Sequence, residues 1–161
     1  PAGSNVSAKV SFLGIGSKTA QFPRVSGTAR ISADRPQDLK LDVSLDARAL
    51  TASDRITTNR LRGEKFFWVE KHPAVRFTGN SLKLTSDRKG IVQGHITARG
   101  VTKPVQLHVT FDKAPATLSA GQALTIRGQT RINRRDFGMT SYSLIVGKTV
   151  SIDLRARVVP R

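Results

Sequence analysis

Alternation of apolar and polar residues is the dominant pattern along this chain. Residues 39–46 read LKLDVSLD, so every second residue is apolar. A period of two predicts a strand with one face buried and the other in water. Six further segments show this period: 6–12, 25–31, 92–98, 105–111, 124–132 and 150–158. The pattern therefore predicts a protein built from antiparallel strands.

An eighth strand is predicted at 75–84, where the alternation changes phase. The apolar residues are odd-numbered before Gly79-Asn80 and even-numbered after it, which indicates a bulge or bend. Eight antiparallel strands joined by short turns are typical of a closed barrel that is filled by side chains or holds one small ligand. We therefore predict an all-β fold, an eight-stranded antiparallel barrel.

A short helix is predicted between the third and fourth strands. Thr51-Ala52-Ser53-Asp54 resembles a capping box with Thr51 as the N-cap, and residues 54–62 can turn helical before Gly63. The apolar face of this helix is thin, and the sequence Phe66-Phe67-Trp68 follows it. These features predict a lid at one end of the barrel rather than a core helix.

Small residues occupy many inward positions of the predicted strands. They are Ala8, Gly27, Ala29, Gly79, Gly94, Ala98, Gly128 and Ala156. A filled barrel would use this volume for larger side chains, so we infer an internal cavity. The alternative is that the glycines relieve strand coiling in a barrel.

Composition excludes fewer classes of function than the alternation of apolar and polar residues does. The length of 161 residues fits one domain, so residues 1–161 are predicted to form a single barrel domain. The absence of cysteine excludes disulfides, thiolate zinc sites and iron–sulfur clusters. A formal net charge of +16 attracts polyanions and anionic membrane surfaces, although a cationic surface for solubility explains it as well.

Signals for catalysis or metal binding are weak. Gly147-Lys148-Thr149 lacks the first glycine of a phosphate-binding loop and precedes a strand. In a hairpin centred on residues 101 and 102, His95 and His108 would stand opposite each other, but no carboxylate shares their outward row. The carboxylates are scattered, with no pair placed in one pocket. We therefore expect no enzyme activity, no metal site and no cofactor.

Five segments of the chain, in order, are similar to motifs of one family. They are Val25-Ser26-Gly27 with Ile31, residues 60–67 (RLRGEKFF), 72–77 (HPAVRF), 94–105 (GHITARGVTKPV) and 132–138 (INRRDFG). With them the chain resembles the YceI-like family of lipocalin-like proteins, which bind polyisoprenoids and other long hydrophobic molecules. The resemblance implies an eight-stranded lipocalin-like barrel with a helical lid, a deep apolar tunnel and no catalytic residues. It also implies export to the periplasm, through a signal peptide that is not present in this chain.

The same resemblance predicts the ligand and its site. The expected ligand is a long hydrophobic amphiphile, such as a polyisoprenoid or an isoprenoid quinone, held in the tunnel for transport, storage or sequestration. Inward phase or position on the lid predicts the lining residues Phe12, Ile31, Leu41, Val43, Ile56, Leu61, Phe66, Phe67, Phe77, Ile96, Leu107 and Ile126. A pyrophosphate head group would pair with Arg60, Arg62 or Arg134, because a guanidinium fork matches phosphate oxygens.

Two other functions are compatible with the charge. One is a nucleic-acid-binding barrel, and the other is a cationic module for a membrane surface that holds no internal ligand. Base stacking needs exposed aromatic side chains among the cations, whereas Phe12, Phe77 and Phe111 lie in the inward phase. We therefore expect a lipid partner and no nucleic acid, an anionic membrane surface as a second partner, and a monomer or homodimer.

Overall fold

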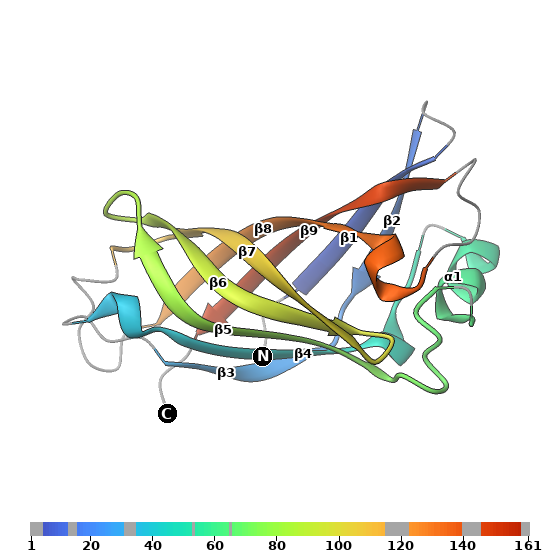
Figure 1. The fold of residues 1–161 in the computed structure, drawn as a ribbon, viewed down its shortest axis with the longest axis horizontal. Helices are drawn as coiled ribbons and strands as arrows, with labels where there is room; N and C mark the ends of the chain where they lie inside the picture. The colour runs from blue at the N-terminus through green and yellow to red at the C-terminus, as the bar shows by residue number, and fades with distance from the viewer. Residues whose placement is uncertain are drawn as a thin grey trace.

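Nine antiparallel strands form one sheet that curls into a nearly closed barrel (Figure 1). The computed structural model describes residues 5–12, 16–30, 35–52, 54–64, 66–114, 123–139 and 146–158. The strands are β1 (Asn5–Phe12), β2 (Gly16–Phe22), β3 (Val25–Arg30), β4 (Lys40–Asp46), β5 (Ala74–Leu84), β6 (Lys89–Ala98), β7 (Val101–Phe111), β8 (Leu124–Asn133) and β9 (Val146–Val158). Their order in the sheet is β2-β1-β9-β8-β7-β6-β5-β4-β3. The predicted all-β antiparallel barrel is confirmed.

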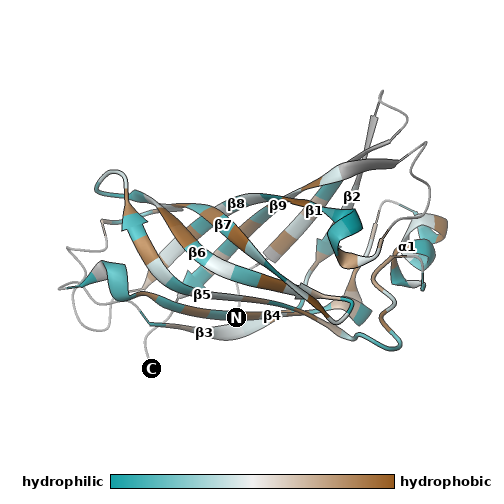
Figure 2. Ribbon diagram, viewed as in Figure 1, coloured by the Kyte–Doolittle hydropathy of each residue, from teal (hydrophilic) through white to brown (hydrophobic). Residues whose placement is uncertain are grey.

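The helices lie at the two ends of the barrel. Helix α1 (Arg55–Arg62) and the short 3₁₀ helix η4 (Arg134–Phe137) lie near one end, which we call the helix end (Figure 1). The 3₁₀ helix η1 (Pro36–Asp38) lies at the other end, and η2 (Ala47–Ala49) follows β4. Figure 2 shows the alternation that forms the strands as brown and teal bands along them.

The predicted number of eight strands is wrong because β2 was missed. Its first four residues are Gly-Ser-Lys-Thr, which carry no alternation. The strand forms because seven of its residues pair with β1, from Phe12 opposite Gly16 to Val6 opposite Phe22. Phe22 is only 2% exposed, so the burial of one large side chain accompanies this pairing.

Strands β2 and β3 are the two edge strands of the sheet, and other segments cover the edge of β2. Thr51, in the segment before α1, pairs with Gln21 of β2 through backbone bonds of 2.7 and 3.0 Å. Phe67, in the segment after α1, meets the ring of Phe22 edge to face at a centroid distance of 5.4 Å. The two segments that flank α1 therefore cover the edge of β2 and fix α1 at the helix end.

Helix α1 is present as predicted, but its N-cap is Asp54 and not Thr51. The Asp54 carboxylate accepts a hydrogen bond from the Thr57 backbone N–H at 2.7 Å. The helix ends at Gly63, whose N–H donates to the Arg60 carbonyl. Thr51 cannot cap the helix because its backbone groups pair with β2.

The hairpin between β6 and β7 turns at Arg99 and Gly100. Both residues have a positive φ, of 51° and 74°, which is the type I′ geometry that matches the twist of the flanking strands. His95 therefore lies opposite Pro104, and His108 lies opposite Ile91. The predicted His95–His108 pairing is wrong, because the turn lies two residues earlier than assumed. The predicted change of phase in β5 is confirmed by a register shift between Gly79 and Ser81.

The glycines of the barrel wall do not leave open space at the positions that can be tested. A Cβ at Gly94 would lie 2.1 Å from the Thr78 carbonyl oxygen. At Gly128 it would lie 2.9 Å from a terminal methyl group of Leu107. Cβ atoms at Gly27 and Gly79 would come within 2.1 and 2.6 Å of other atoms. These four glycines are therefore not evidence for a cavity, because neighbouring backbone or side chains fill the space beside them.

Candidate functional site

Strands β7 and β8 part from each other toward the helix end. They pair only where residues 108–111 of β7 face residues 126–129 of β8, whereas the β6–β7 ladder runs the full length of its hairpin. We call the unpaired stretch, residues 101–107 of β7 and 130–133 of β8, the β7–β8 split. A side-chain hydrogen bond from Thr130 Oγ1 to the Gln106 carbonyl, 2.9 Å long, lies where the strands diverge. Pro104 fits in this stretch because a proline has no N–H to pair with another strand.

The 3₁₀ helix η4 packs against the β7–β8 split, and its sequence explains its shape. The Asn133 side chain accepts a hydrogen bond from the Arg135 N–H at 3.0 Å, and Gly138 ends the turn with a φ of 79°. This turn directs Phe137 and Met139 into the protein, where they are 1% and 5% exposed. Together with Phe66, Ile96 and Ala98 they form a buried group, which we call the helix-end cluster.

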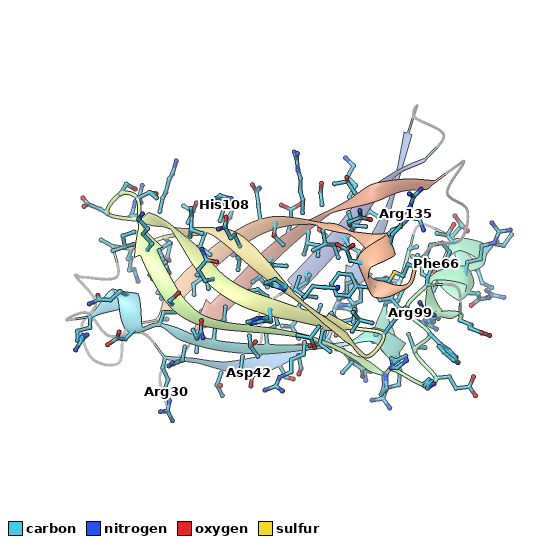
Figure 3. All side chains as sticks on the ribbon, in the orientation of Figure 1. Arg30, Asp42, Phe66, Arg99, His108 and Arg135 are labelled. Atoms are coloured by element: carbon cyan, nitrogen blue, oxygen red, sulfur yellow. The ribbon has the colours of Figure 1, made fainter. Side chains whose placement is uncertain are left out.

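Arg99 connects η4 to the segment that follows α1 (Figure 3). Its guanidinium donates to the Phe137 carbonyl at 3.3 Å and to the Glu64 carbonyl at 2.8 Å. The same group lies 5.8 Å from the centre of the Trp68 ring. Gly138 makes room for it, because a Cβ there would lie 2.6 Å from Arg99 Nη1. The turn residue Arg99 thus holds three parts of the helix end together.

The three arginines predicted to hold a head group lie in different environments. Arg134 is 2% exposed, and its guanidinium donates to the Met139 carbonyl. Burial, and then the charge of Arg135, lower the pKa of Arg134 from its usual value. Arg62 donates twice to the Leu50 carbonyl, at 2.8 and 3.2 Å, and so anchors α1. Arg60 is exposed on α1. The structure does not bring these three side chains together.

The predicted lining residues divide by their degree of burial. Leu41, Val43, Leu107 and Ile126 are buried in the main core, and Phe66 and Ile96 are buried in the helix-end cluster. Leu61, Phe67 and Phe77 are partly buried and pack against both groups. Ile56, on α1, is 67% exposed and belongs to neither group. Ile31 and the side chain of Phe12 lie outside the described part of the chain.

Partly exposed apolar side chains concentrate at the helix end. They pack against the helix-end cluster and are Leu61, Phe67, Val75, Phe77, Val101, Val105, Ile132 and Ile152. At the opposite end, the inward residues Leu82, Val92, Phe111 and Leu124 are at most 3% exposed, whereas Leu84, the last residue of β5, is 37% exposed. The helix end therefore carries the larger group of partly exposed apolar side chains in the described barrel.

Lys103 is a cation near this apolar surface that the sequence analysis did not select. It lies opposite Ile96 of the helix-end cluster, between Val101 and Val105 on β7. Its neighbour Thr102 points to the other face, where its hydroxyl bonds that of Thr97 at 2.7 Å. Lys103 thus starts on the inner face of the β7–β8 split and is exposed. The sequence does carry a signal for this residue. Lys103 lies two residues before Val105 and therefore shares its inward phase.

The described part of the chain carries neither a group of metal ligands nor a helix that could span a membrane. No three or more His, Asp or Glu side chains gather there in a way that could hold a metal ion. No described helix has the length and apolar character needed to cross a bilayer. The described features of the helix end are therefore apolar surface, cations and backbone hydrogen bonds.

Comparisons with known proteins identify the family. A family model described as YceI-like domain matches residues 1–158. A UPF0312 protein of Pseudomonas savastanoi pv. phaseolicola is 28% identical over 134 residues, which are 83% of this chain and 70% of that protein. The structure of Burkholderia cenocepacia BcnA is similar with a TM-score of 0.84 and 19% identity, covering 97% of this chain and 96% of that chain. A polyisoprenoid binding domain from Saccharophagus degradans, implicated in plant cell wall breakdown, has a TM-score of 0.73 and 17% identity, covering 98% and 94%.

The similar structures support a conclusion about the fold, and the family match supports a conclusion about the family. At less than 25% identity, the two solved structures show a shared barrel fold. The family match extends over almost the whole chain, from the first residue to the end of β9. The resemblance inferred from the five sequence segments is therefore confirmed, and this chain belongs to the YceI-like domain family.

Proposed function

We propose that this protein binds a long hydrophobic amphiphile, a polyisoprenoid, isoprenoid quinone or similar lipid, inside its barrel. The observation that carries the proposal is the apolar surface at the helix end, where Phe77 and its neighbours remain partly exposed. Covering such surface favours binding by about 25 cal/mol per Å². The lipid chain would lie along these side chains, with the head group toward the helix end.

The balance of binding energies favours a long ligand. Each buried CH₂ group contributes about 0.8 kcal/mol, whereas association costs roughly 4 to 15 kcal/mol in lost translational and rotational freedom. About ten buried groups are therefore needed before binding becomes favourable. The polyisoprenoid binding in the name of the Saccharophagus degradans domain supports the same class of ligand.

In this proposal the protein carries, stores or sequesters its ligand and catalyses no reaction. Membership of the YceI-like family and the polyisoprenoid-binding relative support binding over catalysis. The proposed location is the periplasm, where a lipid outside a membrane needs a protein to shield its chain from water. The role requires no cofactor besides the lipid itself.

The experiment that tests the proposal is native mass spectrometry of the purified protein, followed by organic extraction. We expect one apolar adduct with the mass of a long-chain lipid. Leu61→Ala is expected to weaken the affinity for a long-chain prenol about tenfold, because three carbons that pack at the helix end are lost. Fluorescence titration with the prenol measures this change.

A matched control lies on the same helix. Ile56 is 67% exposed, so Ile56→Ala should leave the affinity within about twofold of the wild type. A protein that carries no adduct and also fails to bind added prenol would contradict the proposed function. An unchanged affinity in Leu61→Ala would show that this side chain does not contact the lipid, and equal losses from both substitutions would show that the effect is not specific to the packed side of α1.

The position of Lys103 predicts a preference for anionic head groups. Lys103→Met should weaken the binding of a prenyl phosphate about tenfold, because a charge-assisted hydrogen bond is lost, and leave the affinity for the matching prenol unchanged. Lys103→Arg should retain the preference, and Lys83→Met, on the exposed part of β5, should not affect it. Competition of the two ligands measures the ratio. Equal weakening of both would assign Lys103 to packing instead.

A further inference from the structure

Exposed cations gather on the outer face of the sheet that β6, β7, β8, β9 and β1 form. We call the exposed strand residues Lys9, Lys89, Arg127, Arg131, Arg155 and Arg157 the basic face. One row runs across four strands: Lys89 is opposite Thr110, Thr110 is opposite Arg127, and Arg127 is opposite Arg155. Asp153 is the one carboxylate in the sequences of these five described strands. The face therefore has a strong excess of positive charge.

On the outer face of β4 and β5 and just beside it, two arginines are paired with carboxylates, whereas Lys40 and Lys83 on the same strands are exposed. Arg76 donates to the two Asp42 oxygens at 2.6 and 3.0 Å (Figure 3 labels Asp42). Arg48, just after β4, donates to Asp46 at 3.0 Å. For the side chains of Arg127 and Arg155, by contrast, the described part of the chain offers no hydrogen bond or ion pair. The basic face thus carries opposed arginines that no described carboxylate pairs.

Two arginines directly opposite each other on neighbouring strands destabilise a sheet by repulsion. An anionic partner that covers both removes this repulsion and gains two charge-assisted contacts. We propose that the basic face docks this protein on an anionic lipid bilayer. The lipid phosphates then lie over Arg127 and Arg155, and the remaining cations of the face strengthen the attraction.

Two observations favour a bilayer over a nucleic acid. Phe111 is buried, and no Phe, Tyr or Trp side chain is exposed among the described side chains of these five strands, so a stacking platform for single strands is lacking. Arg131 belongs to the part of β8 that borders the β7–β8 split. Docking through this face brings the split close to the bilayer. This choice rests on the proposed function, because the proposed ligand resides in a membrane.

The test is co-sedimentation of the protein with vesicles. Vesicles of phosphatidylcholine and phosphatidylglycerol, at a ratio of about 2 to 1, are compared with vesicles of phosphatidylcholine alone. We expect binding to the anionic vesicles only, and release from them at high salt. Arg127→Gln/Arg155→Gln is expected to weaken binding about 30-fold, which corresponds to roughly 1 kcal/mol for each cation.

The matched control is Arg30→Gln/Lys40→Gln. It lowers the net charge by the same amount and also removes two opposed cations, since Arg30 of β3 lies opposite Lys40 of β4. Its binding should fall by less than about threefold, because its residues lie outside the basic face. Equal losses from both double variants would overturn the proposal, since net charge alone would then explain the binding. Retention of duplex DNA through Arg127 and Arg155, without vesicle binding, would overturn it in favour of a nucleic acid.

Lipid content separates this proposal from the proposed function. The variant Arg127→Gln/Arg155→Gln should keep the adduct of the wild type in native mass spectrometry, because both residues lie on the outer face. It should also unfold at the same or a higher temperature, because the repulsion between the two arginines is removed. Loss of the adduct, or a lower unfolding temperature, would contradict the assignment of these arginines to docking.

Discussion

Replacing Phe137 by alanine is expected to lower the free energy of unfolding by about 3 to 5 kcal/mol. The Phe137 ring is 1% exposed and packs with Ile96 and Met139 beside the β7–β8 split. Because few ladder hydrogen bonds hold β7 and β8 together, the ring packing replaces them as the connection at this end. Urea denaturation followed by circular dichroism measures the change.

The control for this prediction is the preceding residue of the same turn. Asp136 is exposed, so Asp136→Ala should change the free energy of unfolding by less than about 0.5 kcal/mol. If Phe137→Ala lowers the free energy of unfolding as little as the control does, then the packing of η4 does not stabilise this end of the barrel. The loss expected for Phe137→Ala is a large fraction of the 5 to 15 kcal/mol that is typical for a domain.

The strands can be predicted from the sequence wherever apolar and polar side chains alternate. All eight predicted strands are present, because each carries enough inward apolar residues to define its register. Strand β2 was not predicted because only Ala20 and Phe22 mark its inner face, and pairing with β1 forms it. Alternation along one strand carries no information about such pairing between strands.

The candidate site is less predictable from sequence, because it arises where strands separate. Inward phase selected Phe77 and also the fully buried Leu107, and position on the lid selected Leu61, since pattern alone cannot tell core from accessible surface. The sequence predicts Arg134 as a cation for a lipid head group, but the turn at Gly138 places it in the interior. Pro104 lies in the split, but a single proline in the sequence does not show where two strands separate.

Gly94→Ala is expected to lower the free energy of unfolding by about 3 kcal/mol or more, although it adds a single methyl group. The added carbon would lie 2.1 Å from the carbonyl oxygen of Thr78, and a backbone atom cannot rotate away as a side chain can. The two strands β5 and β6 would have to separate near their register shift, with loss of ladder hydrogen bonds. The hypothesis that this glycine borders a cavity predicts the opposite, a neutral substitution.

Alanine substitutions at two other glycines should lower the free energy of unfolding by smaller amounts, which gives an expected order. At Gly128 the added carbon meets the flexible side chain of Leu107, so Gly128→Ala should be intermediate, at about 1 to 2 kcal/mol. At Gly63 the nearest atom is 3.3 Å away, so Gly63→Ala should cost less than about 1 kcal/mol. Thermal and urea denaturation of the three variants measure the order. If Gly94→Ala ranks with Gly63→Ala, then β5 and β6 are not in close contact at this point, and the space inside the barrel is larger than the packing of the wall indicates.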